Sequence, residues 1–317
     1  MMGRLFKELF QALGRFIAYR FATILHGPEV PAAAVVQNGE SHAVEPPAPG
    51  SPALEPLPAI GLDARYEQSI DWPAHRSNVP PAELLSDPLY ELWSTIPEGH
   101  KWTHYFGVYA KVFAQQRAKP LRILEIGVLR GSSLRMWKRY FSHVDTLIVG
   151  LDIDPACAAF DASAEGIHVR IGSQTDQEFL RSVVREFGPF DIIIDDGSHH
   201  SSHIITSFNH LFADGLKDTG IYFVEDLHAN YWLPWRDSAQ SFLDVCKELI
   251  EHMHAHYREA GPAAFFIGKA SDQTFESLSV PVITTMIEEI RIFDSIVAIQ
   301  KTRRNYVPYY LRLDAQP

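Results

Sequence analysis

Apolar residues in the last two thirds of the chain form short continuous runs that alternate with longer stretches of helical period. Short apolar runs bounded by turn residues predict buried strands, and apolar side chains three or four positions apart predict amphipathic helices. The runs predict strands at 121–126, 146–151, 167–171, 190–194, 221–224, 287–292 and 295–300. The helical stretches are 83–116, broken at Pro97–Gly99, a helix that starts at Ser132, 176–186, 200–212 and 239–257.

Strands that alternate with helices indicate βαβ units and a parallel sheet with helices on both faces. The last two predicted strands are joined only by Phe293–Asp294, a link that permits an antiparallel hairpin but no crossover. A five-stranded parallel sheet closed by an antiparallel hairpin strand is the arrangement of class I methyltransferases. We therefore predict an α/β fold with a Rossmann-like, doubly wound sheet that is mostly parallel and has an antiparallel C-terminal hairpin strand.

The beginning of the chain has a different composition. Residues 1–27 carry apolar side chains at helical spacing and predict an amphipathic helix. Residues 1–26 can lie on a membrane surface, or pack on the main domain or a partner subunit, and a homo-oligomer stays open. Residues 28–61 are rich in proline and predict a linker. We expect an N-terminal helical cap at 62–118 and the main domain at 119–317.

Charge and cysteine content exclude several classes of protein. The net charge is −11, which argues against nucleic acid as the main partner because phosphate binding needs clustered cations. Two cysteines can form neither a disulfide framework nor a cysteine-rich zinc site. No run approaches the ~18 apolar residues of a membrane-spanning helix. We expect a cytoplasmic protein.

The first predicted strand runs into a glycine turn, Glu125–Gly131. Gly127 lets the chain turn off the strand, and Gly131 lets the backbone approach a ligand at the start of the helix. A nicotinamide fingerprint would have the spacing G-x-G-x-x-G and would bind a pyrophosphate. Two glycines four positions apart, with Glu125 before them, favour S-adenosylmethionine, which has no phosphate. The alternative is an ordinary tight turn of a doubly wound protein.

Polar residues that end the second and third predicted strands supply further cofactor candidates. Asp152 has the position of an acid that accepts hydrogen bonds from both ribose hydroxyls of a nucleoside. Gln174, in the segment 172–176, has a side chain that could bind the adenine edge. Asp154 before Pro155 is a helix cap, and Ser173 or Thr175 could equally cap the next helix.

Pairs of acids end the fourth and fifth predicted strands, Asp195–Asp196 and Glu225–Asp226. Neighbouring strands lie about 4.8 Å apart, so these carboxylates converge and repel each other. A divalent cation relieves the repulsion, and oxygen ligands suit Mg²⁺ better than Zn²⁺. The alternative is that the acids cap helices or face water.

Histidine follows the first of these pairs. His199 lies near the predicted start of the next helix, and both a helix N-terminus and a nearby cation disfavour imidazolium. A neutral imidazole can take a proton from a hydroxyl, so His199 is the candidate general base. His200 and His203 are weaker candidates.

The segments LEIGVLRGSSLRMW, GLDID, FDIIIDDGSHH, SFNHLF and YFVEDLHANYW resemble the metal-dependent sugar O-methyltransferases of macrolide biosynthesis, the mycinamicin type. HKWTHYFGVYAKVF and IRIFDSIVAIQK also fit, so the resemblance covers about residues 97–302. It implies S-adenosylmethionine held at Glu125–Gly131 and Asp152. It also implies Mg²⁺ on Asp196, Glu225 and Asp226, and His199 as general base. We also expect Gln174 and Asp196 to contact the cofactor.

The expected activity is methyl transfer from S-adenosylmethionine to a hydroxyl of a sugar or glycosylated natural product, a small-molecule substrate. Trp102, Tyr105, Tyr231 and Trp232 could stack on the sugar, although each can equally be a core residue. Two alternatives stay open. One is a non-catalytic binding module on a methyltransferase fold. The other is an antibiotic-pathway hydroxylase or methyltransferase of the cephalosporin type, which an iron site of His199, His203 and Asp196 would favour.

Overall fold

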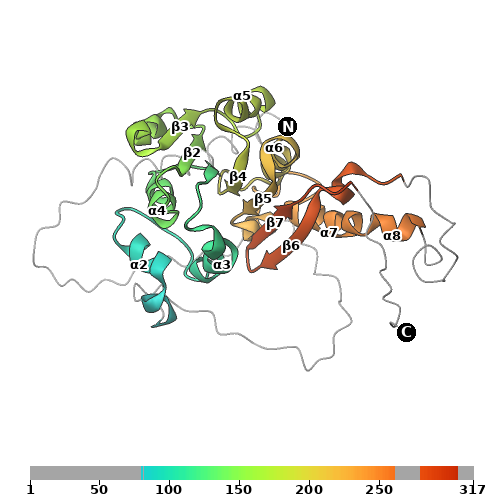
Figure 1. The fold of residues 1–317 in the computed structure, drawn as a ribbon, viewed down its shortest axis with the longest axis horizontal. Helices are drawn as coiled ribbons and strands as arrows, with labels where there is room; N and C mark the ends of the chain where they lie inside the picture. Colours follow the sequence, from blue (N-terminus) through green and yellow to red (C-terminus); the bar gives the residue numbers. More distant parts are fainter. Residues whose placement is uncertain (1–79, 81, 261–278, 306–317) are drawn as a thin grey trace, which may run out of the picture. The chain divides into compact units, whose positions relative to one another are not determined.

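The computed structural model describes residue 80, residues 82–260 and residues 279–305, which contain one sheet (Figure 1). Its strands are β1 (Arg122–Ile126), β2 (Leu147–Asp152), β3 (Ile167–Ile171), β4 (Phe190–Asp195), β5 (Leu216–Val224), β6 (Ile287–Phe293) and β7 (Ile296–Lys301). The strand order is β3-β2-β1-β4-β5-β7-β6. β1 to β5 pair in parallel, and β7 pairs antiparallel with both β5 and β6. The predicted fold class is confirmed.

Helices connect the strands. The α-helices of the described residues are α2 (Pro88–Ser94), α3 (Tyr105–Phe113), α4 (Ser132–Tyr140), α5 (Gln177–Phe187), α6 (Ser201–Asp214), α7 (Phe242–Met253) and α8 (Ala255–Ala260). The 3-10 helices are η2 (Ala82–Ser86), η3 (Ala114–Gln116), η4 (Pro155–Phe160), η5 (Ser163–Glu165), η6 (Leu227–Tyr231) and η7 (Val282–Thr285). None of the helices in the described residues has the length and apolar composition that a membrane span requires.

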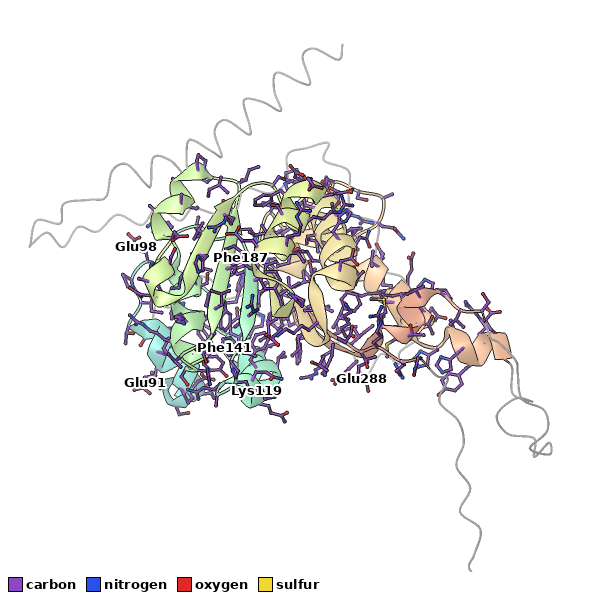
Figure 2. All side chains as sticks on the ribbon, turned by 45° about the horizontal axis from the view of Figure 1, so that its top comes forward. Glu91, Glu98, Lys119, Phe141, Phe187 and Glu288 are labelled. Carbon is purple, nitrogen blue, oxygen red and sulfur yellow. The ribbon has the colours of Figure 1, made fainter. Side chains whose placement is uncertain are left out.

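Both faces of the sheet are buried, because successive strand residues point to opposite sides. Ile123 and Ile148 belong to a core cluster with α2, α3 and α4. Leu124 and Val149 belong to a second cluster with α5, α6 and α7. Figure 2 shows the side chains on this frame, with buried Phe141 inside it and exposed Glu91 and Glu288 at its margins. The apolar strands predicted for a sheet covered on both faces are thus explained.

Most differences from the predicted elements have a local cause. β5 starts at Leu216, earlier than predicted, because exposed polar residues at 218 and 219 hide the strand in the hydrophobic pattern. The predicted helix 239–257 starts later, since Ser241 and Asp244 form a capping box that fixes the first turn of α7. It is divided at His254, the C-cap of α7. The hairpin link is Asp294–Ser295, one residue later than expected.

Part of the predicted domain organisation falls outside the described residues. These are the amphipathic helix at 1–27 and the linker at 28–61. Of the predicted helical cap, 62–118, the structure describes residue 80 and residues 82–118. These contain α2 and α3, which pack on the sheet through the same core cluster as α4. The boundaries at 27, 61 and 118 therefore stay predictions.

Candidate active site

The chain order reverses between β1 and β4, which lie side by side in the sheet. In open α/β sheets, ligands bind beyond the carboxyl ends of the strands at such a reversal. The predicted site residues lie at these ends of β1 to β5, or in the loops that follow. Three non-glycine residues in these loops have left-handed backbones, Leu129, His199 and Asp226, with φ of 50°, 61° and 56°. Such conformations cost about 1–3 kcal/mol each and cluster at functional sites.

The glycine turn brings two loops into close contact. Gly127 has φ 96°, and a Cβ at this position would lie 2.2 Å from the backbone oxygen of Asp196. The Asp196 N–H in turn donates to the carbonyl of Ile126 at 3.0 Å. Gly131 is the N-cap of α4 with φ 65°. Gly127 therefore lets the loop after β1 touch the loop that carries the candidate metal ligand Asp196.

Asp152 ends β2 and holds the glycine turn in place. Its Oδ2 accepts the backbone N–H groups of Val128 at 2.8 Å and Leu129 at 3.0 Å, and its Oδ1 accepts the N–H of Asp154 at 2.9 Å. Asp154 caps η4, as the sequence predicts. Sequence reasoning did not foresee that Asp152 binds the turn. The role of Asp152 toward ribose stays a prediction.

Gln174 is buried and joins two loops of the site. Its Oε1 accepts the backbone N–H of Ser198 at 2.9 Å, and its Nε2 lies 3.3 Å from Oδ1 of Asp195. Ser207 on α6 donates to the other oxygen of Asp195 at 2.5 Å. Burial raises the pKa of Asp195, although the hydrogen bonds from Ser207 and Gln174 oppose this. Gln174 and Asp195 thus support the loop that carries Asp196 and His199, and contact between Gln174 and adenine stays a prediction.

Glu125 is fully buried in β1. Its Oε1 accepts the indole N–H of Trp137 at 3.1 Å, and its Oε2 has no hydrogen-bond partner among the described residues. Burial raises the pKa of Glu125 to about 7. An unpaired buried carboxylate oxygen is costly, so a cationic ligand beside it would be stabilised.

Asp196, His199 and Asp226 form a compact donor set. One donor atom of each lies within 4.8 Å of the other two. His199 Nε2 is 3.7 Å from Oδ2 of Asp226. The hydroxyl of Tyr105 donates to the other oxygen of Asp226, at 2.5 Å, and orients that carboxylate. Two predicted metal ligands are therefore together with the predicted base.

Glu225 does not belong to this donor set of the described residues. Its Oε2 accepts the Lys101 ammonium at 2.7 Å, and both of its oxygens accept the hydroxyl of Tyr109 at 2.9 Å. Lys101 also donates to Oδ2 of Asp196 at 2.6 Å. Burial alone would lower the pKa of Lys101, but Asp196 and Glu225 raise it well above the ordinary value. Glu225 as a metal ligand stays a prediction.

Aromatic residues lie next to Asp226. The His228 ring packs edge-on against Trp102, at 5.3 Å between centroids, and against Trp232, at 4.6 Å. Trp102 and Trp232 are 50% and 49% exposed, and Tyr231 is exposed as well. Tyr105 is buried and bonded to Asp226, so it belongs to the interior of the site. Of the four predicted acceptor residues, three therefore face solvent.

Known proteins resemble this chain in sequence and in fold. No family model matches the chain. L-olivosyl-oleandolide 3-O-methyltransferase of Streptomyces antibioticus is 37% identical over 183 residues, 52% of this chain and 46% of that protein. An 8-demethyl-8-alpha-L-rhamnosyl tetracenomycin-C 2'-O-methyltransferase of Streptomyces olivaceus is 35% identical over 188 residues, 55% of this chain and 47% of that protein.

A solved structure of MycE methyltransferase from the mycinamycin biosynthetic pathway, in complex with Mg and SAH, aligns with a TM-score of 0.57 and 28% identity. The alignment covers 75% of this chain and 58% of MycE. The chain is similar in sequence to sugar O-methyltransferases of macrolide and tetracenomycin pathways. Its sheet is that of a class I methyltransferase. The matched sequence spans about half the length of these two curated relatives.

Sequence reasoning missed four residues that support the candidate site through contacts with its carboxylates: Lys101, Tyr109, Ser207 and Tyr222. Tyr105 and Tyr109 are four positions apart on α3, and that spacing places both hydroxyls on one helix face. From this spacing, two hydroxyl groups directed at one side of the helix could have been predicted from the sequence. Lys101 gave none, because a single lysine before a helix is ordinary.

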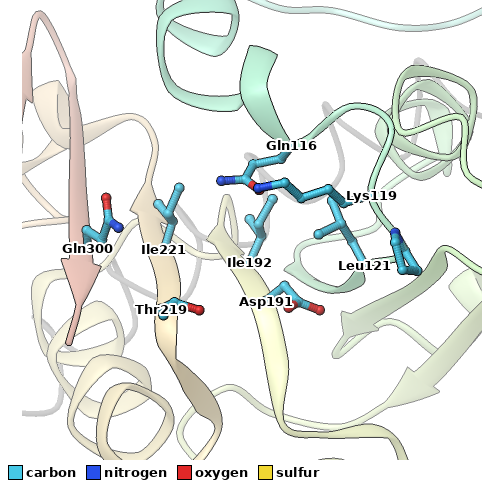
Figure 3. A pocket seen from close by; sticks show the side chains of 9 residues that line it. Gln116, Lys119, Leu121, Asp191, Ile192, Thr219, Ile221 and Gln300 are labelled. Carbon is cyan, nitrogen blue, oxygen red and sulfur yellow. The ribbon is translucent and has the colours of Figure 1, made fainter. Parts of the chain in front are cut away.

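A cavity of about 460 Å³ lies at the other end of the sheet (Figure 3). Its lining includes Leu121 just before β1, Asp191 and Ile192 at the start of β4, and Gln300 near the end of β7. The site residues occupy the opposite ends of β1 and β4. The cavity is therefore separate from the candidate site.

Proposed function

We propose that this protein transfers a methyl group from S-adenosylmethionine to a hydroxyl of a sugar or glycosylated natural product, with a divalent metal and a histidine base. The observation that carries the proposal is the donor set Asp196, His199 and Asp226 beside the glycine turn. The relatives support it, since their names describe O-methyltransferases of glycosylated compounds.

The residues at the end of β1 fit S-adenosylmethionine. The unpaired Oε2 of Glu125 is an acceptor for an ammonium group, which this cofactor carries. Gly127 and Gly131 leave the turn without side chains that would block close approach. Asp152 would bind the ribose while holding the turn, and Gln174 and Asp196 would lie beside the bound cofactor. MycE was solved with SAH, the product of such a transfer.

Asp196 and Asp226 fit a Mg²⁺ ion, because carboxylate oxygens are its preferred protein ligands. Glu225 lies one residue away and would join them once released from Lys101. A bound Mg²⁺ supplies Lewis acidity that makes a nearby hydroxyl more acidic. MycE was solved with Mg.

His199 would take the proton of the acceptor hydroxyl. Asp226, 3.7 Å from Nε2, would stabilise the resulting imidazolium. The acceptor oxygen would then bond to the methyl carbon of S-adenosylmethionine as the bond between that carbon and sulfur breaks, and His199 would hold the proton. The protein mainly supplies positioning.

The exposed faces of Trp102 and Trp232 would bind the acceptor. Both indoles pack against His228, which follows Asp226 by two residues. Aromatic faces beside a metal site suit a sugar, whose C–H groups pack on the ring while its hydroxyls reach the metal. A small-molecule glycoside is therefore the proposed substrate.

The proposal is tested with radiolabelled S-adenosylmethionine, Mg²⁺ and a panel of rhamnosylated and macrolide glycosides, alongside their aglycones. Label should enter a glycoside and not its aglycone, and the transfer should stop in excess chelator. Transfer that continues at full rate in chelator would refute the metal-assisted mechanism.

His199→Ala should reduce turnover by roughly 10²–10⁴-fold, the usual scale of a general base. The affinity for S-adenosylmethionine should stay unchanged. The Mn²⁺ affinity of the variant distinguishes a general base from a metal ligand. If His199 were a metal ligand, its replacement would weaken Mn²⁺ binding as well as reduce turnover. His210→Ala, in the helix α6 that follows His199, is the matched control. Near-normal turnover in folded His199→Ala protein would exclude the base role.

The cephalosporin-type hydroxylase alternative has less support. Within the described residues, the three-donor set contains one histidine and two carboxylates, and it leaves out His203. His203 Nδ1 is instead 2.8 Å from the hydroxyl of Ser198. A site with two histidines and one carboxylate, which suits non-haem iron, is therefore not favoured. The non-catalytic alternative is disfavoured because Asp152, Asp196, His199, Glu225 and Asp226 are all present.

A cytoplasmic location also stays a proposal. Cys157 and Cys246 are both buried and free, which fits a reducing compartment. Membrane attachment or self-association through residues 1–26 concerns the part of the chain outside the described residues, and a homo-oligomer is untested.

A further inference from the structure

The Lys101 ammonium lies between two carboxylates that the proposed metal would also use. Its Nζ is 2.6 Å from Oδ2 of Asp196 and 2.7 Å from Oε2 of Glu225. The Lys101 side chain is only 8% exposed, so both contacts are shielded from water. Such charge-assisted hydrogen bonds are stronger than neutral ones.

Other residues hold this arrangement in place. Tyr109 donates to both oxygens of Glu225 and keeps that carboxylate directed at Lys101. Lys101 lies on the loop between α2 and α3, and the chain then enters α3, which carries Tyr109. One short segment thus supplies both partners of the buried Glu225.

The carboxylates need a cation. Glu125 lies near the end of β1, and Asp196, Glu225 and Asp226 follow the ends of the neighbouring strands β4 and β5. Among the described lysines and arginines, Lys101 is paired with this cluster. Without a cation, the buried Glu225 and the half-buried Asp196 would repel each other and lack a compensating charge. A lysine at this point provides that compensation when no metal is bound.

We propose that Lys101 is an internal counter-ion that takes the place of the divalent metal between Asp196 and Glu225, and that the metal binds by displacing it. Lys101 is in this sense a positioning residue for the metal site. The inference rests on the metal part of the proposed function. It adds that metal affinity is set by competition with a side chain of the same protein.

The competition predicts that removal of Lys101 strengthens metal binding. In Lys101→Met, the metal no longer has to displace two charge-assisted hydrogen bonds, so Mn²⁺ should bind about tenfold tighter or more. A lysine that only supports the fold would give the opposite result, since its loss would loosen the site. Lys101→Arg keeps the charge and should bind Mn²⁺ no tighter than the original protein does.

The experiment is a direct Mn²⁺ titration of the full chain, followed by paramagnetic resonance of the free ion. Lys217→Met is the matched control, because Lys217 pairs with Asp191 at 2.8 Å near the start of β4, away from the site. It should leave Mn²⁺ affinity unchanged. The same four proteins are melted with and without Mn²⁺, and Lys101→Met should lose thermal stability without metal and gain more from Mn²⁺ than the others.

Unchanged or weaker Mn²⁺ binding in Lys101→Met overturns the inference, as does equal tightening in Lys217→Met. If Lys101→Met is unfolded without metal, folding restored by Mn²⁺ supports the inference, and failure of Mn²⁺ to restore it counts against it. Absence of Mn²⁺ binding in all four proteins would refute the metal site itself, and with it the metal part of the proposed function. No methyl acceptor is needed, so the two failures are distinguishable.

Discussion

Gly127 is the position where one methyl group should do most damage to the site. Its φ of 96° lies in the left-handed region, which costs a non-glycine residue about 1–3 kcal/mol. An alanine Cβ would also lie 2.2 Å from the oxygen and 2.8 Å from the carbon of the Asp196 carbonyl. Both are backbone atoms, so one of the two loops must move.

The two effects set the size of the change. Overpacking in a well-packed region costs about 1–3 kcal/mol, so Gly127→Ala should lower the free energy of unfolding by about 2–6 kcal/mol in total. Displacement of the Asp196 loop should also weaken Mn²⁺ binding. Gly107 on α3 is the matched control, because a Cβ there meets nothing within 4 Å. Gly107→Ala should stabilise the protein by about 0.5–1 kcal/mol, the helix preference of alanine over glycine.

Urea unfolding followed by tryptophan fluorescence measures both changes on one scale. The reasoning requires a lower midpoint for Gly127→Ala and an equal or higher one for Gly107→Ala. If Gly127→Ala unfolds within about 0.5 kcal/mol of the original protein, the scale of an ordinary surface substitution, the close loop contact is refuted.

Three further predictions concern the site. Glu125→Gln should remove a pH dependence of the free energy of unfolding. The pKa of Glu125 is about 7 in the folded protein against 4.5 in the unfolded chain, so Glu125 contributes about 3 kcal/mol to the free energy of unfolding below pH 4.5, and this contribution is lost as pH rises through 7. Unfolding curves of both proteins from pH 4.5 to 8 measure that difference, and parallel curves would contradict it. Asp152→Ala should weaken S-adenosylmethionine by about 2 kcal/mol, the scale of charged hydrogen bonds, and Asp154→Ala should not. Equal calorimetric affinities in the two variants would place the ribose elsewhere. Trp102→Ala should raise KM for the glycoside and leave cofactor affinity unchanged, and initial-rate kinetics with an unaltered KM would remove Trp102 from the acceptor surface.

Most strands and helices could be predicted from the sequence, because they depend on local patterns of apolar and polar residues. The run at 167–171 has apolar residues at every second position and the run at 190–194 is mostly apolar, and β3 and β4 lie there almost residue for residue. The hairpin followed from the short link after Phe293. β5 was recognised only in part, because its first residues pair with β4 at an irregular register while their polar side chains face solvent.

The candidate site was predictable as a list of residues and less so as a set of contacts. Strand ends placed Asp196, His199 and Asp226 near each other, since parallel strands end at one edge. The partner of Glu225 was not predictable, because Lys101 lies 124 positions away in the chain and reaches the site only through the packing of α3. The left-handed backbones of His199 and Asp226 left only a weak mark in residue type, because aspartate and histidine are enriched in this region but adopt it far less often than glycine.

The central claim is that the carboxyl ends of β1, β2 and β4 bind S-adenosylmethionine. A calorimetric titration of the full chain with S-adenosylmethionine, with and without Mg²⁺, tests it most directly. The account predicts saturable binding of one cofactor per chain, weakened by Asp152→Ala. Absence of binding heat in both conditions would contradict the account. The titration is repeated at a second temperature, so that a binding enthalpy of zero at one temperature is not mistaken for absence of binding.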